Sequence, residues 1–286
     1  MSHIPVLLDE VLEVLKPAPS KVFIDGTFGA GGYSRALLER GADVLAFDRD
    51  PSVAPVAARL EKEYGARFRF INAKFSEIPK LAAEKASCEG LDGLVLDIGV
   101  SSMQIDQAAR GFSYTKDGPL SMSMGGGTLS AEEVVNKYKE EKLADVLYNY
   151  GELRNSRALA RKIVAARPVS STLALADIVG QAHASRVFQA IRIEVNDELG
   201  ELSRALAGAD KIIKPGGVLA VVSFHSLEDR IVKKFFASDS VSRYSPASTA
   251  TKPFQSGAKN AIIPSGAEIA KNPRAASAKL RFGIRA

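Results

Sequence analysis

The chain has 286 residues, of which 46% are hydrophobic and 25% charged, and its formal net charge at pH 7 is +5. This length can bury a large core, in one large domain or in two. No apolar run approaches the roughly 20 residues of a membrane-spanning helix, and the N-terminus lacks the basic and apolar regions of a secretory signal. A single cysteine, Cys88, excludes a disulfide framework and a cysteine-based zinc site. We expect a cytoplasmic protein with no membrane partner and no metal.

The positive charge is concentrated near the C-terminus. Residues 230–286 hold 11 Lys and Arg against 2 acids, whereas the residues before them hold 27 against 31. A basic segment favours a polyanionic partner, because each lysine or arginine that meets a phosphate releases counterions. A solvated tail without a partner explains the charge equally well.

Apolar runs alternate with amphipathic stretches through the first hundred residues. The expected strands are residues 22–25, 44–48, 68–72 and 94–97, and the expected helices are residues 32–40, 51–64 and 76–87. Regular alternation of this kind predicts an α/β fold with a doubly wound, mostly parallel sheet of the Rossmann-like type. Three of the strands end in an acid, at Asp25, Asp48 and Asp97. Carboxylates at this edge of a parallel sheet face the ligand crevice.

A glycine-rich turn, residues 25–33, separates the first strand from the first of these helices. Its glycines allow the backbone to approach a ligand closely, and Asp48 can bind two ribose hydroxyls. Gly29 and Gly31 match the first two glycines of the dinucleotide fingerprint, but Ser34 occupies the third position. Asp25 and Asp97 suit a cation. The site therefore favours S-adenosylmethionine, which carries an ammonium, a sulfonium and a ribose, over NAD, which remains the alternative.

The alternation stops after residue 97. A loop rich in glycine, serine and methionine is expected over residues 99–127, and a mainly helical stretch over residues 130–183. The sheet pattern resumes with a long helix at residues 187–211, a stop at residues 214–217, a strand at residues 218–222 and a loop at residues 239–259. We expect a methyltransferase-type domain at residues 1–127 and 187–286, with an inserted helical domain for substrate recognition at residues 128–186.

Eight motifs resemble, in unbroken order, the bacterial small-subunit rRNA cytidine-N4 methyltransferase family (RsmH, also called MraW). They are His3-Ile4-Pro5-Val6-Leu7-Leu8-Asp9-Glu10, Asp25-Gly26-Thr27-Phe28-Gly29-Ala30-Gly31-Gly32, Asp48-Arg49-Asp50-Pro51, Asp97-Ile98-Gly99-Val100-Ser101-Ser102, Arg110-Gly111-Phe112-Ser113, Phe188-Gln189-Ala190-Ile191-Arg192-Ile193 with Val195-Asn196-Asp197-Glu198-Leu199, Ser223-Phe224-His225-Ser226-Leu227-Glu228-Asp229-Arg230, and Asn272-Pro273-Arg274 with Ser277-Ala278-Lys279-Leu280-Arg281. The set covers nearly the whole chain and is far more specific than any one motif.

The resemblance implies methylation of the exocyclic amine of one cytidine in 16S rRNA near the ribosomal P site, with S-adenosylmethionine as cofactor and the small ribosomal subunit as partner. The family's cofactor contacts, carried over by position, fall on Gly31, Gly32, Tyr33, Asp48, Phe75, Asp97 and Gln104. Apart from the resemblance, Phe75 lies between a strand and a helix and is typical of a core residue.

Transfer to cytosine N4 requires an acceptor for an N4 proton, because the nitrogen lone pair is shared with the ring. Asp97 at the sheet edge and His225 after the next strand are the candidate catalytic residues, and a histidine that only holds the turn is the alternative for His225. Glu228 and Asp229 are expected to be structural, in a helix-capping pattern that begins at Ser226. Methylation at cytosine C5 would need a cysteine nucleophile, and the position of Cys88 in a polar loop argues against it.

Basic and aromatic side chains are the candidates for RNA binding. Arg154, Arg157 and Arg161 recur at helical spacing, with Lys162 and Arg167 nearby, and would form one basic face for phosphates. A plain solvated face is the alternative. Phe112 or Tyr114 would stack on the extruded base, or pack in the interior instead.

Three stretches depart from the family pattern. Ser121, Ser123 and Gly125 stand where the family has two acids and an arginine, Leu153 stands in place of a second glutamate, and the stretch around His183 is shortened. These departures affect the expectations about target recognition and turnover but not cofactor binding. The alternatives are thus an rRNA-binding assembly factor for the 30S subunit that binds the cofactor but has lost turnover, and a nicotinamide dehydrogenase. The oligomeric state stays open, with a homodimer as one alternative.

Overall fold

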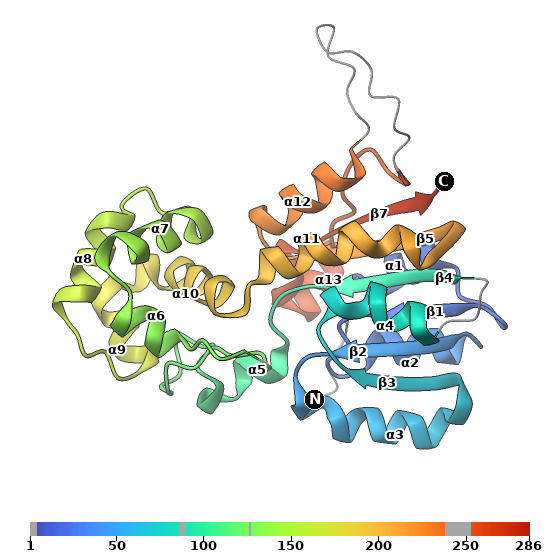
Figure 1. Ribbon diagram of the computed structural model, residues 1–286, viewed down its shortest axis with the longest axis horizontal. Helices are drawn as coiled ribbons and strands as arrows, with labels where there is room; N and C mark the ends of the chain where they lie inside the picture. The colour runs from blue at the N-terminus through green and yellow to red at the C-terminus, as the bar shows by residue number, and fades with distance from the viewer. Residues whose placement is uncertain (1–4, 86–89, 126, 238–252) are drawn as a thin grey trace, which may run out of the picture. The chain divides into compact units, whose positions relative to one another are not determined.

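The computed structural model describes residues 5–85, 90–125, 127–237 and 253–286 (Figure 1). The chain forms two compact units, one of Met1–Gly99 with Gly200–Ala286 and the other of Val100–Leu199. An α/β unit interrupted by a mainly helical insertion agrees with the expected architecture. The insertion is longer than expected, because the expected boundaries at residues 127 and 187 both fall inside the second unit.

The first unit is built on a seven-stranded sheet of order β3-β2-β1-β4-β5-β7-β6. The strands are β1 (Val22–Asp25), β2 (Asp43–Asp48), β3 (Phe68–Asn72), β4 (Leu91–Asp97), β5 (Ile213–Ser223), β6 (Phe254–Ser256) and β7 (Lys279–Arg285). Strands β1 to β5 pair in parallel, and β7 runs antiparallel to both of its neighbours. The doubly wound, mostly parallel sheet predicted from the sequence is confirmed.

The register of this sheet brings the three expected acids to one edge. Asp25 at the end of β1 lies opposite Ala46 and Val95. Asp48 and Asp97 follow those two partners by two residues each, so both close their strands just beyond Asp25. The ends of parallel strands meet at the same side of a sheet, which is where such folds bind ligands.

Helices cover both faces of the sheet in the first unit. α1 (Leu8–Leu15), α2 (Gly32–Glu39) and α3 (Ala54–Tyr64) contact the strands on one face, whereas α4 (Ile78–Lys85), α11 (Glu198–Gly208) and α12 (Ser226–Phe236) share an apolar core with the other. A short helix, α13 (Gly266–Lys271), precedes β7. Six 3₁₀ turns are described: η1 (Pro51–Val53), η2 (Gly65–Arg67), η3 (Phe75–Glu77), η4 (Ala108–Arg110), η5 (Ala209–Lys211) and η6 (Pro273–Ser277). No helix among the described residues is long and apolar enough to span a bilayer.

The second unit is helical. Its helices are α5 (Ser102–Asp106), α6 (Ala131–Lys137), α7 (Glu140–Gly151), α8 (Ser156–Ala165), α9 (Thr172–Val179) and α10 (Gln181–Asn196). Phe112, Leu120 and Met122 before α6, and Val187 and Ile191 on α10, are buried in one core with α6 to α9. This shared core explains the difference in boundaries, since neither stretch packs with the sheet as the sequence pattern suggested.

The long helix expected at residues 187–211 is in fact two helices. α10 already begins at Gln181, and the chain breaks at Asp197, which has a φ of 51°. The side-chain amide of Asn196 donates to the carbonyl oxygens of Met122 and Arg192, at 2.8 and 2.9 Å, and so fixes the break. The helical period of the apolar residues continues across the break, so the sequence pattern does not show it. The break depends on Met122, which lies 74 positions away in the sequence.

Two C-terminal expectations also change. β5 begins at Ile213, and the expected stop at residues 214–217 forms an irregularity inside it, where the β4–β5 register shifts. The loop expected at residues 239–259 contains β6, which pairs with β7, and residues 238–252 lie outside the described residues. A three-residue antiparallel strand has no recognisable period of its own.

Candidate functional site: the strand-end acids and the glycine turn

The glycine turn between β1 and α2 has a backbone that only glycine adopts easily. Gly29 and Gly31 have φ angles of 52° and 79°, and Gly31 is the N-cap of α2. A Cβ at Gly31 would lie 3.0 Å from the ring of Phe28, and one at Gly32 would collide with the ring of Pro5. The shape of the turn therefore requires these glycines by itself.

The N-terminus of α2 is arranged to receive an anion. Gly31 has no side chain to cap the helix, and the amide of Ser34 donates to Asp25, so the amides of Gly32 and Tyr33 are the ones that can donate to a ligand here. A carboxylate such as that of an amino-acid moiety fits this position.

Asp25 fixes the shape of the turn. Its Oδ1 accepts a hydrogen bond from the amide of Thr27 at 3.2 Å, and its Oδ2 accepts from the amide and hydroxyl of Ser34 at 3.1 and 2.7 Å. The side chain is fully buried, and burial raises its pKa to about 6. Ser34, which breaks the dinucleotide fingerprint, is thus a partner of Asp25. Direct contact between Asp25 and a cofactor stays a prediction.

Asp48 joins the turn to the end of β2. Its Oδ2 accepts from the amide of Gly29 at 2.8 Å, and its Oδ1 from the amide of Asp50 at 2.8 Å. Burial is the main cause that raises its pKa, and these amide hydrogen bonds oppose the rise. Each carboxylate oxygen has a second lone pair, so the side chain can still accept from ribose hydroxyls.

Asp97 differs from the other two acids in the surroundings of one of its carboxylate oxygens. Its Oδ1 is buried without a hydrogen-bond partner among the described residues. Burial, reinforced by the negative charges of Asp25 and Glu228, raises its pKa to about 8. Its amide donates to Oγ1 of Thr27 at 2.7 Å, which ties β4 to the glycine turn. Thr27 and Ser34, which were not predicted to be site residues, both bind strand-end acids, and their place beside those acids in the sequence was the available signal.

Tyr33 and Phe75 are placed differently from each other. Tyr33 is buried, and its hydroxyl donates to the carbonyl oxygen of Val6, so a cofactor contact is left to its backbone amide. Phe75 opens η3 after β3 and is only partly buried, against the core shared by α4 and α11. Partial burial is compatible both with a cofactor contact and with a core role for Phe75.

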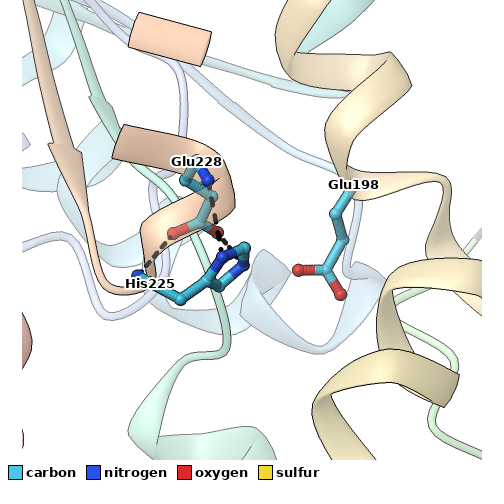
Figure 2. A group of neighbouring side chains, drawn as sticks. All are labelled: Glu198, His225 and Glu228. Atoms are coloured by element: carbon cyan, nitrogen blue, oxygen red, sulfur yellow. Dashed lines mark hydrogen bonds and ion pairs between the residues drawn. The ribbon is translucent and has the colours of Figure 1, made fainter. Parts of the chain in front are cut away.

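His225 caps α12 (Figure 2). Its Nδ1 accepts from the amide of Glu228 at 3.4 Å, and Oε2 of Glu228 accepts in return from the amides of Phe224 and His225, at 2.8 and 3.2 Å. The capping box therefore begins one residue before the expected Ser226, which is the first residue of the helix. Nε2 of His225 lies 3.0 Å from Oε1 of Glu228, without the angle of a hydrogen bond.

The expected structural roles of the two acids agree with this geometry. Glu228 is buried in the capping box, and Asp229 binds Arg281 and Lys279 of β7 at 2.7 and 3.3 Å. These ion pairs also occupy two of the basic residues near the C-terminus, so that charge is partly structural. The catalytic role of His225 stays a prediction.

Comparisons with known proteins show the family of the chain. The model of the MraW methylase family matches residues 1–285. Ribosomal RNA small subunit methyltransferase H of Brucella suis is 50% identical, over 99% of this chain and 87% of its own length, and that of Brucella ovis is 49% identical over the same shares. An rRNA methylase structure from Streptococcus thermophilus aligns with 97% of the chain and 93% of its own length at 10% identity, with a TM-score of 0.44.

The chain belongs to the MraW methylase family. It is a methyltransferase, and its cofactor is S-adenosylmethionine, as the turn and the three acids predicted. The nicotinamide dehydrogenase is thereby overturned as an alternative. Its expectation rested on two glycines that this family shares with dinucleotide-binding proteins.

Among the second-unit residues expected to bind the cofactor or the base, Gln104 and Phe112 are buried. Oε1 of Gln104 accepts from the amide of Ser101 at 3.0 Å in the capping box of α5. Phe112 is 8% exposed within the helical core, which favours packing in the interior over stacking on a base. Tyr114 is partly buried, edge-on to Phe188 with ring centroids 5.8 Å apart. Cofactor contact by Gln104 and base contact by Tyr114 stay predictions.

The arginines expected to form one basic face differ in their surroundings: Arg154, Arg157 and Arg161 are exposed, whereas Arg167 binds backbone carbonyl oxygens. Arg157 and Arg161 lie exposed on α8, one turn apart, and Arg161 approaches Glu140 at 3.6 Å. Arg154 is exposed but precedes the helix, so the three do not share one helical face as expected. Arg167 is structural, since its guanidinium donates to the carbonyl oxygens of Val135 and Tyr138, both at 2.7 Å.

Two of the departures from the family pattern can be examined in the structure. Leu153 is 4% exposed in the helical core, which suits an apolar residue better than a glutamate. The loop with Ser121, Ser123 and Gly125 is fixed by its backbone: the carbonyl oxygen of Ser123 accepts from Arg110 at 2.9 Å. Nothing in the structure explains the loss of two acids and an arginine there.

Proposed function

We propose that the chain transfers a methyl group to the exocyclic N4 amine of a cytidine in 16S rRNA near the P site, during small-subunit maturation in the cytoplasm. The names of the Brucella relatives support ribosomal RNA of the small subunit as substrate. The N4 atom is what the resemblance of the motifs to the family implies, and the acid at the end of β4 offers that atom a proton acceptor.

The residues at the sheet edge fit S-adenosylmethionine. The amides of Gly32 and Tyr33 at the start of α2 suit its carboxylate, and Asp48 suits its ribose. The unpartnered Oδ1 of Asp97 suits a positive charge, since an acid buried without a partner gains most from a cation. When bound, the cofactor supplies the methyl group and the sulfur that leaves.

Asp97 carries the proposal as the proton acceptor. A pKa of about 8 keeps its carboxyl group protonated at neutral pH in the free enzyme. A cation beside it lowers that pKa and leaves a carboxylate. The carboxylate then accepts an N4 proton as the bond between N4 and the methyl carbon forms and the bond between carbon and sulfur breaks. Asp97 thus removes the proton that would otherwise leave N4 cationic.

We give His225 a structural role before a catalytic one. Its ring is held against α12, so we assign it first to the geometry of the loop after β5. Proton transfer through Nε2 would require the ring to leave Glu228. Exposed Arg157 and Arg161, with Arg154, supply phosphate contacts on the helical unit.

The test uses the purified chain, radiolabelled S-adenosylmethionine, and 30S particles and naked 16S rRNA from cells that lack the modification. We expect label on the RNA, recovered as N4-methylcytidine after digestion to nucleosides. Asp97→Asn should remove the label, whereas Asp92→Asn, at the opposite end of β4, should keep it. Label on C5 or on another nucleoside contradicts the proposal. Binding of particles without label by the unmodified chain would instead support the assembly factor.

A further inference from the structure

A hydrogen bond joins the segment before α1 to the short helix α13 in the first unit. Oε1 of Glu268, on α13, accepts from the backbone amide of Leu7 at 2.7 Å, across 261 positions of sequence. Leu7 is the N-cap of α1, has a φ of 53° and has no side-chain cap. Glu268 therefore supplies from far along the chain the negative charge that the start of a helix favours.

The segment held by this bond lies against the glycine turn. The ring of Pro5 occupies the space where a side chain of Gly32 would be, and the carbonyl oxygen of Val6 accepts from the buried hydroxyl of Tyr33. Residues 5–7 thus contact both residues that open α2. The negative charge of Glu268 also contributes to raising the pKa of Tyr33, behind burial and the charges of Asp97 and Asp25, which places it near this cluster.

Glu268 is itself held in place. Its amide donates to Oγ of Ser265 at 3.1 Å, which caps α13, and its side chain is partly buried. A chain of contacts consequently runs from α13 through Leu7 to Val6, and from Val6 to Tyr33 in the turn that receives the cofactor.

We propose that Glu268 is a positioning residue for the methyl-donor site. It fixes residues 5–7, and these hold Gly32 and Tyr33 in the geometry that presents the start of α2 to the donor. The inference rests on the location of the donor site in the glycine turn, and it does not depend on which RNA atom is methylated.

Binding of S-adenosylmethionine and S-adenosylhomocysteine by isothermal titration tests this role. Glu268→Ala should raise both dissociation constants about tenfold, the order of effect of losing one hydrogen bond to a charged group. With 30S particles as acceptor, KM for the donor should rise by the same factor while kcat changes less than about twofold. A residue that serves only stability would lower the unfolding temperature and leave both dissociation constants unchanged in the folded protein.

Conservative and matched variants sharpen the result. Glu268→Gln keeps an acceptor oxygen for the amide of Leu7 and should restore most of the affinity. Glu13→Ala removes an exposed acid from α1 itself and should bind the donor normally. If Glu268→Ala and Tyr33→Phe act through the same segment, their combined effect should be smaller than the product of the single effects.

The outcomes separate this inference from the proposed function. Unchanged donor affinity in folded Glu268→Ala, or an equal loss in Glu13→Ala, overturns the positioning role, even if rRNA is methylated. Normal donor binding by the unmodified chain without label on rRNA overturns the proposed function and leaves the Glu268 measurement valid.

Discussion

The strand-end acids Asp25, Asp48 and Asp97 form the proposed donor edge of the sheet. They and the arginines of the helical unit were both identified from the sequence, but the two groups lie in opposite environments. Asp25 and Asp48 are held by backbone amides, and Asp97 has a buried oxygen without a partner among the described residues. Arg157 and Arg161 are exposed, and the ion pair of Arg161 with Glu140 is 3.6 Å long.

This difference matters because burial of a charge is costly and exposure of one is not. An acid that remains in a buried position without a partner needs a reason, and a ligand or a proton supplies it. An exposed arginine needs none, and exposed ion pairs contribute about 0–1 kcal/mol. Substitutions at the donor edge should therefore have large effects, and substitutions on the basic face small ones.

The largest effect is expected for Asp97→Asn. Removing a positioned proton acceptor should lower kcat by about 10²- to 10⁴-fold. Single-turnover transfer of radiolabel to 30S particles measures this directly. A rate within about threefold of the unmodified chain would remove Asp97 from the chemistry and leave His225 as the candidate.

The same substitution should make the fold more stable at alkaline pH. The folded-state pKa of Asp97 is about 8, above the value of 3.8 for the unfolded chain. The folded state thus binds the extra proton, and stability falls as pH rises from about 4 to 8. Asparagine cannot ionise, so thermal unfolding at about pH 8.5 should show a gain of about 1–3 kcal/mol, the cost of a buried unpaired group. A loss of stability at that pH would contradict the burial argument.

The next largest effect is expected for Asp48→Ala. The substitution removes the acceptor for ribose hydroxyls and also the partner of the amides of Gly29 and Asp50. The dissociation constant for S-adenosylmethionine should rise about 10- to 100-fold, as for the loss of one or two hydrogen bonds to a charged group. Asp43→Ala, at the opposite end of β2, is the control and should bind normally. Equal losses in the two variants would point to damage to the strand instead.

A smaller effect is expected from pH on donor affinity. Below about pH 8 the carboxyl group of Asp97 is protonated in the free enzyme, and binding of a cation must release that proton. Affinity should therefore rise about tenfold from pH 6 to pH 7, where the donor keeps its ammonium charge. Asp25, with a pKa of about 6, acts in the same direction at lower pH. Isothermal titration should show this slope in the unmodified chain and a flatter one in Asp97→Asn; equal slopes would assign the proton elsewhere.

Local pattern placed the three strand-end acids well, for a physical reason. A buried strand, a turn and a helix are each encoded within about ten neighbouring residues, so the acids that end β1, β2 and β4 could be placed from sequence. Features set by distant partners could not. The break at Asp197 depends on the hydrogen bond of Asn196 with Met122, and β6 exists only because it pairs with β7.

The basic face shows the other limit of prediction from sequence. Helical spacing placed Arg157 and Arg161 correctly, but it could not show that Arg167 fills backbone acceptors or that Phe112 is buried. Charge and aromaticity describe a residue type, whereas exposure depends on the tertiary fold.

The smallest effect is expected on this basic face. Replacing both Arg157 and Arg161 by alanine should raise KM for 30S particles about fivefold at low salt, with kcat unchanged. The slope of log KM against log salt should fall by roughly one for each phosphate that the variant no longer neutralises. Arg59→Ala, an exposed arginine on α3, is the matched control.

Arg167→Ala should instead lose stability, because the carbonyl oxygens of Val135 and Tyr138 are left without their donor. Its salt slope should match that of the unmodified chain, since its guanidinium already serves the fold. If the slope also stays unchanged in the Arg157 and Arg161 double variant, the RNA phosphates are bound elsewhere. The basic residues near the C-terminus would then be the next to test. Lys279 and Arg281 would come last, because Asp229 already holds both of them.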